Sequence, residues 1–192
     1  MTELSLPDRI VAIDGCLTAA KVPHAFGGAL ALAYYAEPRV TVDIDLNVFV
    51  TTDEFERVAK ALRELGVETD VDETALHRDG QCRLRWDRTP VDLFFAYDDF
   101  HDAMRKQARL VPFADTRVRI LAPEHLIVCK AALDRAKDWI DIEQMLVATD
   151  PLDLDEVRHW LDRFIAADDP RSQRVDSLLA ELRDPEDAGA DE

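Results

Sequence analysis

Three aspartates carry the residue type and spacing from which chemistry can be inferred. Asp43 and Asp45 are two positions apart, and Asp92 lies in a second segment with similar alternation. On a strand, Asp43 and Asp45 would leave the same face and repel each other unless a cation lay between them. Magnesium suits such a group, because it binds a few carboxylates together with phosphate oxygens and water. Three converging acids could hold two metal ions that activate a hydroxyl and stabilise departing pyrophosphate.

The same spacing also has a plain structural interpretation, in which Asp43, Asp45 and Asp92 face solvent from an antiparallel sheet. Short motifs of this kind match by chance. The neighbouring residues favour the functional interpretation. Gly27-Gly28 lies at an expected strand-to-helix junction, where bare backbone N–H groups can receive phosphate. We therefore expect Gly27 and Gly28 to bind nucleotide.

Arginines lie beside both acidic segments. Arg39 and Thr41 lead directly into the acid pair and are candidate nucleotide-binding residues. We expect Arg39 either to bind phosphate or to hold its loop against a carboxylate. An ordinary surface ion pair is an equal alternative. Arg83 and Arg85 precede the third acid. They either line a polynucleotide groove or balance nearby acids.

The elements that must position these residues follow from periodicity. Alternation over 42–50 predicts a strand with one apolar face, formed by Val42, Ile44, Leu46, Val48 and Val50. The pattern over 82–95 predicts a β-hairpin that turns around Thr89-Pro90. The other expected elements are helices from Pro7, over 29–35, 52–65 and 99–107, an extended stretch at 22–26 and a strand near 117–121.

From Pro123 onward the pattern is helical to about residue 182, with breaks near Asp150-Pro151 and Asp169-Pro170. The fold class is therefore α+β, with a small mixed or antiparallel twisted sheet flanked by helices and followed by a C-terminal helical bundle. We expect a core at 1–121, a helical region packed on it at 122–182, and an acidic, disordered tail at 183–192.

The formal net charge of −17 opposes attraction to nucleic acid and to anionic membranes. The three cysteines are far apart and lack zinc-site spacing, which indicates free thiols in a reducing compartment. No basic-then-apolar leader and no apolar run of roughly 20 residues is present. These features predict a cytoplasmic protein that does not contact membranes.

At this point the sequence resembles the AbiEii/MenT-type nucleotidyltransferases, toxin components of bacterial toxin–antitoxin systems within the DNA-polymerase-β-like superfamily. One block runs from Gly27-Gly28 to Asp43-Ile44-Asp45, and a second runs over 121–142. Together they cover about residues 20–146, while residues 150–192 match nothing familiar.

The resemblance implies a polymerase-β-like core and transfer of a nucleoside monophosphate from an NTP to a hydroxyl, releasing pyrophosphate. It implies Mg²⁺, with Mn²⁺ as the alternative, held by Asp43, Asp45 and Asp92. Asp92 would bind the second ion and help deprotonate the acceptor. It also implies the 3′ end of tRNA as the acceptor and a cognate antitoxin as partner.

The second block has its own physical interpretation. Asp134, Lys137, Asp138 and Asp141 follow Lys130 at positions that share one side of a helix. A solvated, charge-laddered face is one alternative, and a second helix that begins near Asp138 and interrupts the shared side is another. The resemblance implies that Lys130 is catalytic and approaches the triphosphate, and that Lys137 and Asp138 complete the nucleotide site.

Two other functions remain open. Because the chain is so acidic, it could transfer a nucleotide to a small cationic acceptor such as an aminoglycoside. It could also be a non-catalytic module that binds a nucleotide or an antitoxin.

Overall fold

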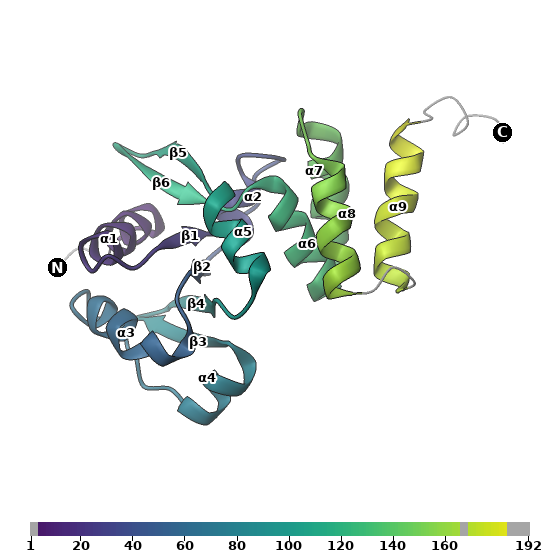
Figure 1. Ribbon diagram of the computed structural model, residues 1–192. Coiled ribbons are helices and arrows are strands. Elements are labelled where there is room, and N and C mark those ends of the chain that lie inside the picture. The colour runs from purple at the N-terminus through teal and green to yellow at the C-terminus, as the bar shows by residue number, and fades with distance from the viewer. Residues whose placement is uncertain (1–3, 166–168, 184–192) are drawn as a thin grey trace. The chain divides into compact units, whose positions relative to one another are not determined.

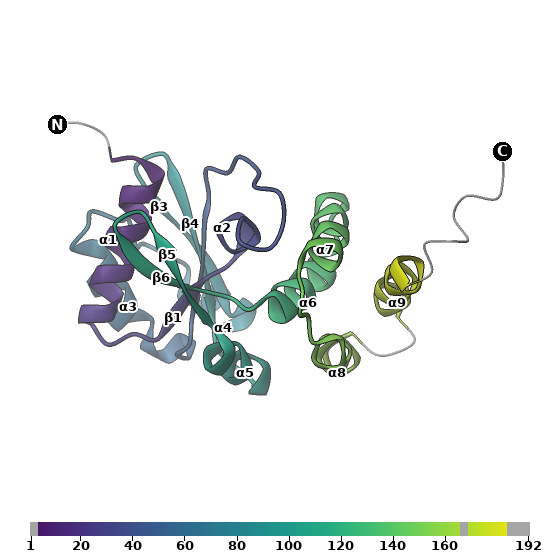
Figure 2. The same ribbon diagram turned by 90° about the horizontal axis from the view of Figure 1, so that it is seen from above.

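The strands form one mixed sheet. The computed structural model describes residues 4–165 and 169–183, and within these ranges the sheet has six strands in the order β3-β4-β2-β1-β6-β5 (Figures 1 and 2). The strands are β1 (His24–Phe26), β2 (Ile44–Val48), β3 (Gln81–Trp86), β4 (Thr89–Phe95), β5 (Arg109–Phe113) and β6 (Thr116–Ile120). The pairs β2–β4 and β1–β6 are parallel, and the remaining neighbours are antiparallel. A mixed sheet flanked by helices confirms the predicted fold class.

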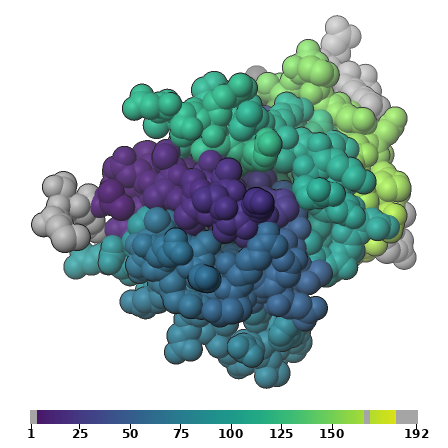
Figure 3. All heavy atoms as spheres, turned by 60° about the vertical axis from the view of Figure 1, so that its left-hand side comes forward, coloured from purple at the N-terminus to yellow at the C-terminus, as the bar shows by residue number. Residues whose placement is uncertain are grey.

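Several of the helices preceding residue 122 have side-chain N-caps, from Ser5, Asp72 and Asp98. The helical elements in this part of the described chain are α1 (Leu6–Ala19), α2 (Gly28–Leu32), the 3₁₀ turn η1 (Thr52–Glu54), α3 (Phe55–Arg63), α4 (Glu73–Asp79) and α5 (Asp99–Gln107). Ser5 and Asp8 form a capping box at the start of α1. The helix α1 packs against α3 and contacts β6, and in the space-filling view it lies between α3 and the β5–β6 hairpin (Figure 3).

Strand β2 follows the predicted alternation from its first residue onward. Ile44, Leu46 and Val48 are almost fully buried, whereas Asp45 between them is partly exposed. Burying three such apolar side chains contributes roughly 1.5–3 kcal/mol each, which fixes which face carries the acids. The expectation that Val42 joins the apolar face was wrong, because the strand begins at Ile44 and Val42 is 66% exposed.

The hairpin forms as expected, but its turn lies earlier than predicted. Asp87 and Arg88 make the turn, and Asp87 adopts φ 55°, a left-handed conformation that a short polar side chain tolerates. Pro90 instead lies on β4, opposite Arg85. The β2–β4 pairing begins only at Val91, so the missing N–H of Pro90 removes no bond from that ladder.

The chain divides into two compact units. Among the described residues, the first unit comprises those up to Ala31 together with Arg39–Ala122, and it contains the whole sheet. The second comprises Leu32–Pro38 and the residues from Pro123 onward. The expected acidic tail lies outside the described residues, apart from Arg183.

The second unit is helical, with its helices packed on one another. Its helices are α6 (Pro123–Leu133), α7 (Ala136–Ala148), α8 (Leu154–Phe164) and α9 (Pro170–Arg183). The breaks at Asp150-Pro151 and Asp169-Pro170 occur as predicted. The single helical face drawn from Lys130 to Asp141 was wrong, because Asp134 adopts φ 52° and separates α6 from α7.

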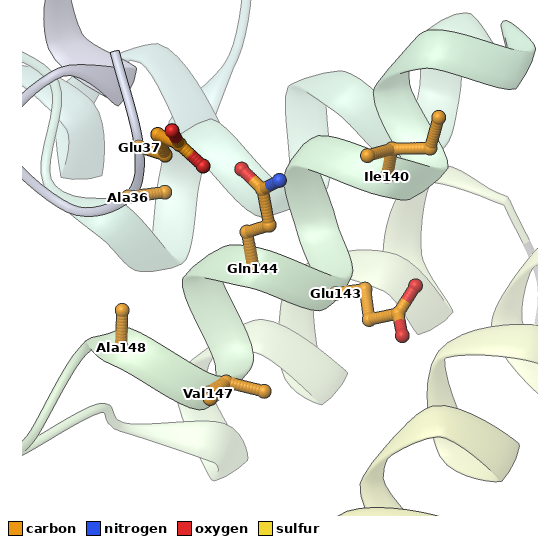
Figure 4. Close-up of a pocket in the computed structure, with 7 residues that line it drawn as sticks. All are labelled: Ala36, Glu37, Ile140, Glu143, Gln144, Val147 and Ala148. Atoms are coloured by element: carbon orange, nitrogen blue, oxygen red, sulfur yellow. The ribbon is translucent and has the colours of Figure 1, made fainter.

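A surface pocket of about 410 Å³ lies within the second unit. In Figure 4 the side chains of Glu37 and Gln144 face one another. Ile140 precedes Gln144 on α7 and Val147 follows it. None of the sequence-predicted site residues lines this pocket.

No helix in the described ranges has the length and apolar character that crossing a bilayer requires.

Candidate active site

The sheet brings two of the three aspartates into direct register. Asp45 on β2 lies opposite Asp92 on the parallel neighbour β4. Asp43 lies just before the strand, and its carboxylate is 4.0 Å from Nη2 of Arg83, which also donates to Asp92. We call Asp43, Asp45 and Asp92 the acid face. Strand pairing therefore brings Asp45 and Asp92 together on one face, since Leu46 and Leu93, one position on, are buried on the opposite side.

Arg83 extends this row onto a third strand. It lies opposite Asp92 in the antiparallel β3–β4 pair. Its Nε donates to Oδ1 of Asp92 and its Nη2 to Oδ2, both at 2.7 Å. Its Nη2 is also 4.0 Å from a carboxylate oxygen of Asp43. Hydrogen bonding to Asp92, reinforced by the charges of the three aspartates, raises the pKa of Arg83.

The Gly27-Gly28 turn contacts the acid face at Asp45. The Gly27 N–H donates to the Asp45 carbonyl at 2.9 Å, which continues the β1–β2 pairing. Gly28 has φ 52°, and a Cβ atom there would lie 1.7 Å from Oδ2 of Asp45. Only glycine combines this conformation with so close an approach. The glycine pair therefore lets the chain pass directly beside a carboxylate.

Thr41 holds the backbone of the first aspartate. Its Oγ1 accepts from the Asp43 N–H at 3.2 Å and donates to the Asp43 carbonyl at 3.4 Å. Arg39 lies two residues earlier and is partly exposed. The structure thus gives Thr41 a positioning contact.

Asn47 was not among the predicted site residues. It lies two positions after Asp45 on β2 and is 7% exposed. Its amide nitrogen would be 3.0 Å from a Cβ at Gly27, so the amide packs against the glycine turn. The alternation placed Asn47 on the acid face, which was the available signal for it.

Most candidates from the second block take part in an ion-pair cluster within the second unit. Lys130 is 3% exposed, and its Nζ donates to Asp141 at 2.6 Å and lies 3.8 Å from Asp138. Arg135 donates to both oxygens of Asp138, at 2.5 and 3.0 Å. Lys137 is exposed on α7. The structure therefore brings Lys130 and Asp138 together and leaves Lys137 at the surface.

The donor chemistry of the acid face fits a divalent cation brought in with a triphosphate. Carboxylate and phosphate oxygens are the ligands that Mg²⁺ prefers. Among the described residues, however, no three His, Cys, Asp or Glu side chains are grouped so that they could hold a metal ion by themselves. Asp43 and Asp45 would hold such an ion together with phosphate oxygens.

Comparison with known proteins identifies the family. A family model described as nucleotidyl transferase AbiEii toxin, type IV TA system, matches residues 18–191. The match extends past the expected 20–146 and takes in the C-terminal helices. Comparison with the curated proteins gave no match.

Solved structures share the fold at low sequence identity. A lincosamide antibiotic adenylyltransferase, LnuA, with bound lincomycin superposes with a TM-score of 0.53 at 12% identity, covering 77% of this chain and 100% of that one. An antigenic nucleotidyltransferase-like protein from Paracoccidioides brasiliensis gives 0.52 at 18% identity, covering 93% and 88%. These likenesses concern the fold, and the family model covers most of the sequence. The chain belongs to the AbiEii nucleotidyltransferase toxin family.

Proposed function

We propose that this chain transfers a nucleoside monophosphate from an NTP to an acceptor hydroxyl and acts as the toxin of a bacterial toxin–antitoxin pair. The observation that carries the proposal is the register of Asp45 with Asp92, with Asp43 two residues before. This register supports a site in which three carboxylates act together beside a glycine turn. Such an arrangement suits positioning and charge stabilisation, which account for most of the catalysis in phosphoryl transfer.

In the proposed reaction the acceptor oxygen forms a bond to the α-phosphorus while the bond from that phosphorus to the bridging oxygen breaks. Pyrophosphate leaves with the electron pair, and the hydroxyl proton passes to the acid face. A divalent ion, when bound, would neutralise charge that develops on the phosphate oxygens. Asp43 and Asp45 would hold this ion, preferably Mg²⁺, with Mn²⁺ as a substitute.

The glycine turn and the basic residues are assigned to the nucleotide. Gly27 and Gly28 leave backbone N–H groups and space for phosphate beside Asp45. Arg39 is proposed to contact the nucleotide, and family membership suggests nucleotide-binding roles for Lys130, Lys137 and Asp138. Thr41 contributes by holding Asp43.

The proposed acceptor is the 3′ end of tRNA, and the proposed partner is a cognate antitoxin. The net charge of −17 favours a second candidate, a small cationic acceptor such as an aminoglycoside. An acidic protein attracts a polyamine and repels RNA, and the repulsion strengthens as salt is lowered.

One experiment separates the two acceptors. The protein is incubated with magnesium and each α-labelled NTP, in the presence of total tRNA or of an aminoglycoside panel. Label entering the tRNA 3′ end supports the toxin proposal. Label entering only the aminoglycosides overturns it in favour of the second candidate, and label entering neither acceptor contradicts both.

A further inference from the structure

We infer that Arg83 is the resident cation of the third carboxylate, so that Asp92 anchors Arg83 and does not hold a second metal ion. The inference rests on the proposed function and concerns the same site. It replaces a two-metal arrangement with one divalent ion at Asp43 and Asp45 and a guanidinium at Asp92.

The first support is the register, which fixes Arg83 in place. Arg83 lies opposite Asp92 on β3–β4, and Asp92 lies opposite Asp45 on β4–β2. Cross-strand partners have Cβ atoms roughly 5 Å apart. Backbone pairing along the whole hairpin therefore positions the guanidinium beside Asp92.

The second support is the geometry of the ion pair. Both Asp92 oxygens accept from Arg83 at 2.7 Å, in the bidentate arrangement that gives the strongest charge-assisted bonds. The Asp92 side chain is only 15% exposed, so water screens this pair less than a surface pair. A metal ion at Asp92 would have to displace Arg83 or lie beside its positive charge.

The third support is the position of Arg83 relative to the other acids. Its Nη2 is 4.0 Å from Asp43, and its charge interacts favourably with Asp45 as well. The guanidinium thus offsets the repulsion among the three carboxylates, which is the role a second metal ion would have. Its Nη1 makes no hydrogen bond to any described residue, and it remains a donor for a phosphate oxygen.

The test is a titration of Mn²⁺ alone, with free ion measured by electron paramagnetic resonance. Arg83→Gln should bind one more Mn²⁺ ion than the wild type, because Asp92 is released. The double variant Arg83→Gln, Asp92→Asn should return to the wild-type stoichiometry, and it also avoids an uncompensated carboxylate if the single variant folds poorly. Arg85→Gln is the matched control, since it removes the same charge from the same face of β3.

Three results would overturn the inference. The first is a wild type that binds two ions and an Asp92→Asn variant that binds one. The second is an Arg83→Gln variant that binds the same number of ions as the wild type. The third is an equal gain in Arg85→Gln, which would reduce the effect to overall charge.

A second readout follows Arg83 directly, without activity. The Nε–H resonance of Arg83, assigned by its loss in Arg83→Gln, should persist when the wild type is saturated with Mg²⁺. Its disappearance on Mg²⁺ addition would show that the ion displaces Arg83. Failure of the proposed function is distinguishable, because it would appear as absent nucleotidyl transfer while Arg83→Gln still gained an Asp92-dependent ion.

Discussion

The Cα atom of Gly28 lies directly beside the carboxylate of Asp45, because a Cβ built at Gly28 falls 1.7 Å from Oδ2. A methyl group there would clash with the Asp45 carboxylate. The backbone at this position also has φ 52°, which is strained for any residue with a Cβ atom. We predict that Gly28→Ala destabilises the protein by about 1–3 kcal/mol and strongly reduces nucleotidyl transfer. Urea unfolding and an initial-rate assay measure the two effects.

Gly15→Ala is the control for that variant. Gly15 lies within α1, and a Cβ there meets nothing within 4 Å. Alanine should stabilise the helix by roughly 0.5–1 kcal/mol and leave transfer unchanged. Unaltered activity in Gly28→Ala would show that the turn does not shape the site.

The site illustrates what the sequence could and could not predict. Alternation placed Asp43 and Asp45 on one face, and the order of the motifs identified the family. The Arg83–Asp92 ion pair depended on the register of the hairpin, which the turn at Asp87-Arg88 sets and the expected turn at Thr89-Pro90 would have shifted. The register of Asp45 with Asp92 depended on β2 and β4 being neighbours. Strand order is a tertiary property that alternation within one strand does not contain.

We predict that Lys130→Met destabilises the second unit. The ammonium is nearly fully buried between Asp141 and Asp138, so its removal leaves a buried carboxylate without a countercharge. Breaking a buried pair in this way costs about 3–5 kcal/mol. Urea unfolding followed by the fluorescence of Trp139, which is buried on α7, reports this loss.

Lys137→Met is the matched control, since Lys137 is an exposed lysine on the next helix, α7. Its unfolding free energy should change by no more than about 0.5 kcal/mol. Weaker NTP binding by this stable variant would support the proposed nucleotide contact. Equal stability of Lys130→Met and the wild type would contradict the buried ion pair.

We predict that stability falls as the pH is lowered below about 6.5, the ordinary pKa of histidine. His125 on α6 is fully buried, and burial lowers its pKa despite the nearby Glu156 and Glu124 carboxylates. The unfolded chain then binds a proton that the folded chain does not. Stability is therefore present above the unfolded pKa and is lost as the pH falls toward the folded pKa.

Thermal unfolding between pH 5 and 7.5 measures this dependence. His125→Gln should flatten the acid side of the profile, whereas His159→Gln, at an exposed position on α8, should not. Identical profiles for the wild type and His125→Gln would show that the acid sensitivity arises elsewhere.

The fold was predictable where local signals were strong and was missed where they were weak. The Asp99–Gln107 helix was expected at its observed bounds, since Asp98 caps its first turn. The strand β5 was missed because its exposed, edge position leaves little alternation to detect. A second helix from about Asp138 was one of the expected alternatives, and its start at Ala136 was not identified because Asp134, and no glycine or proline, adopts the left-handed conformation after α6.

The central claim is that the acid face performs nucleotidyl transfer, and Asp45→Asn tests it most directly. The measurement is incorporation of α-labelled NTP into the acceptor that the wild type labels, with Asp53→Asn as a control at an 86% exposed site. Loss of an acid that stabilises charge during the reaction should raise the activation free energy by several kcal/mol. This corresponds to a rate lower by roughly 10³-fold. Circular dichroism should show an intact fold. Undiminished transfer by Asp45→Asn would contradict the account.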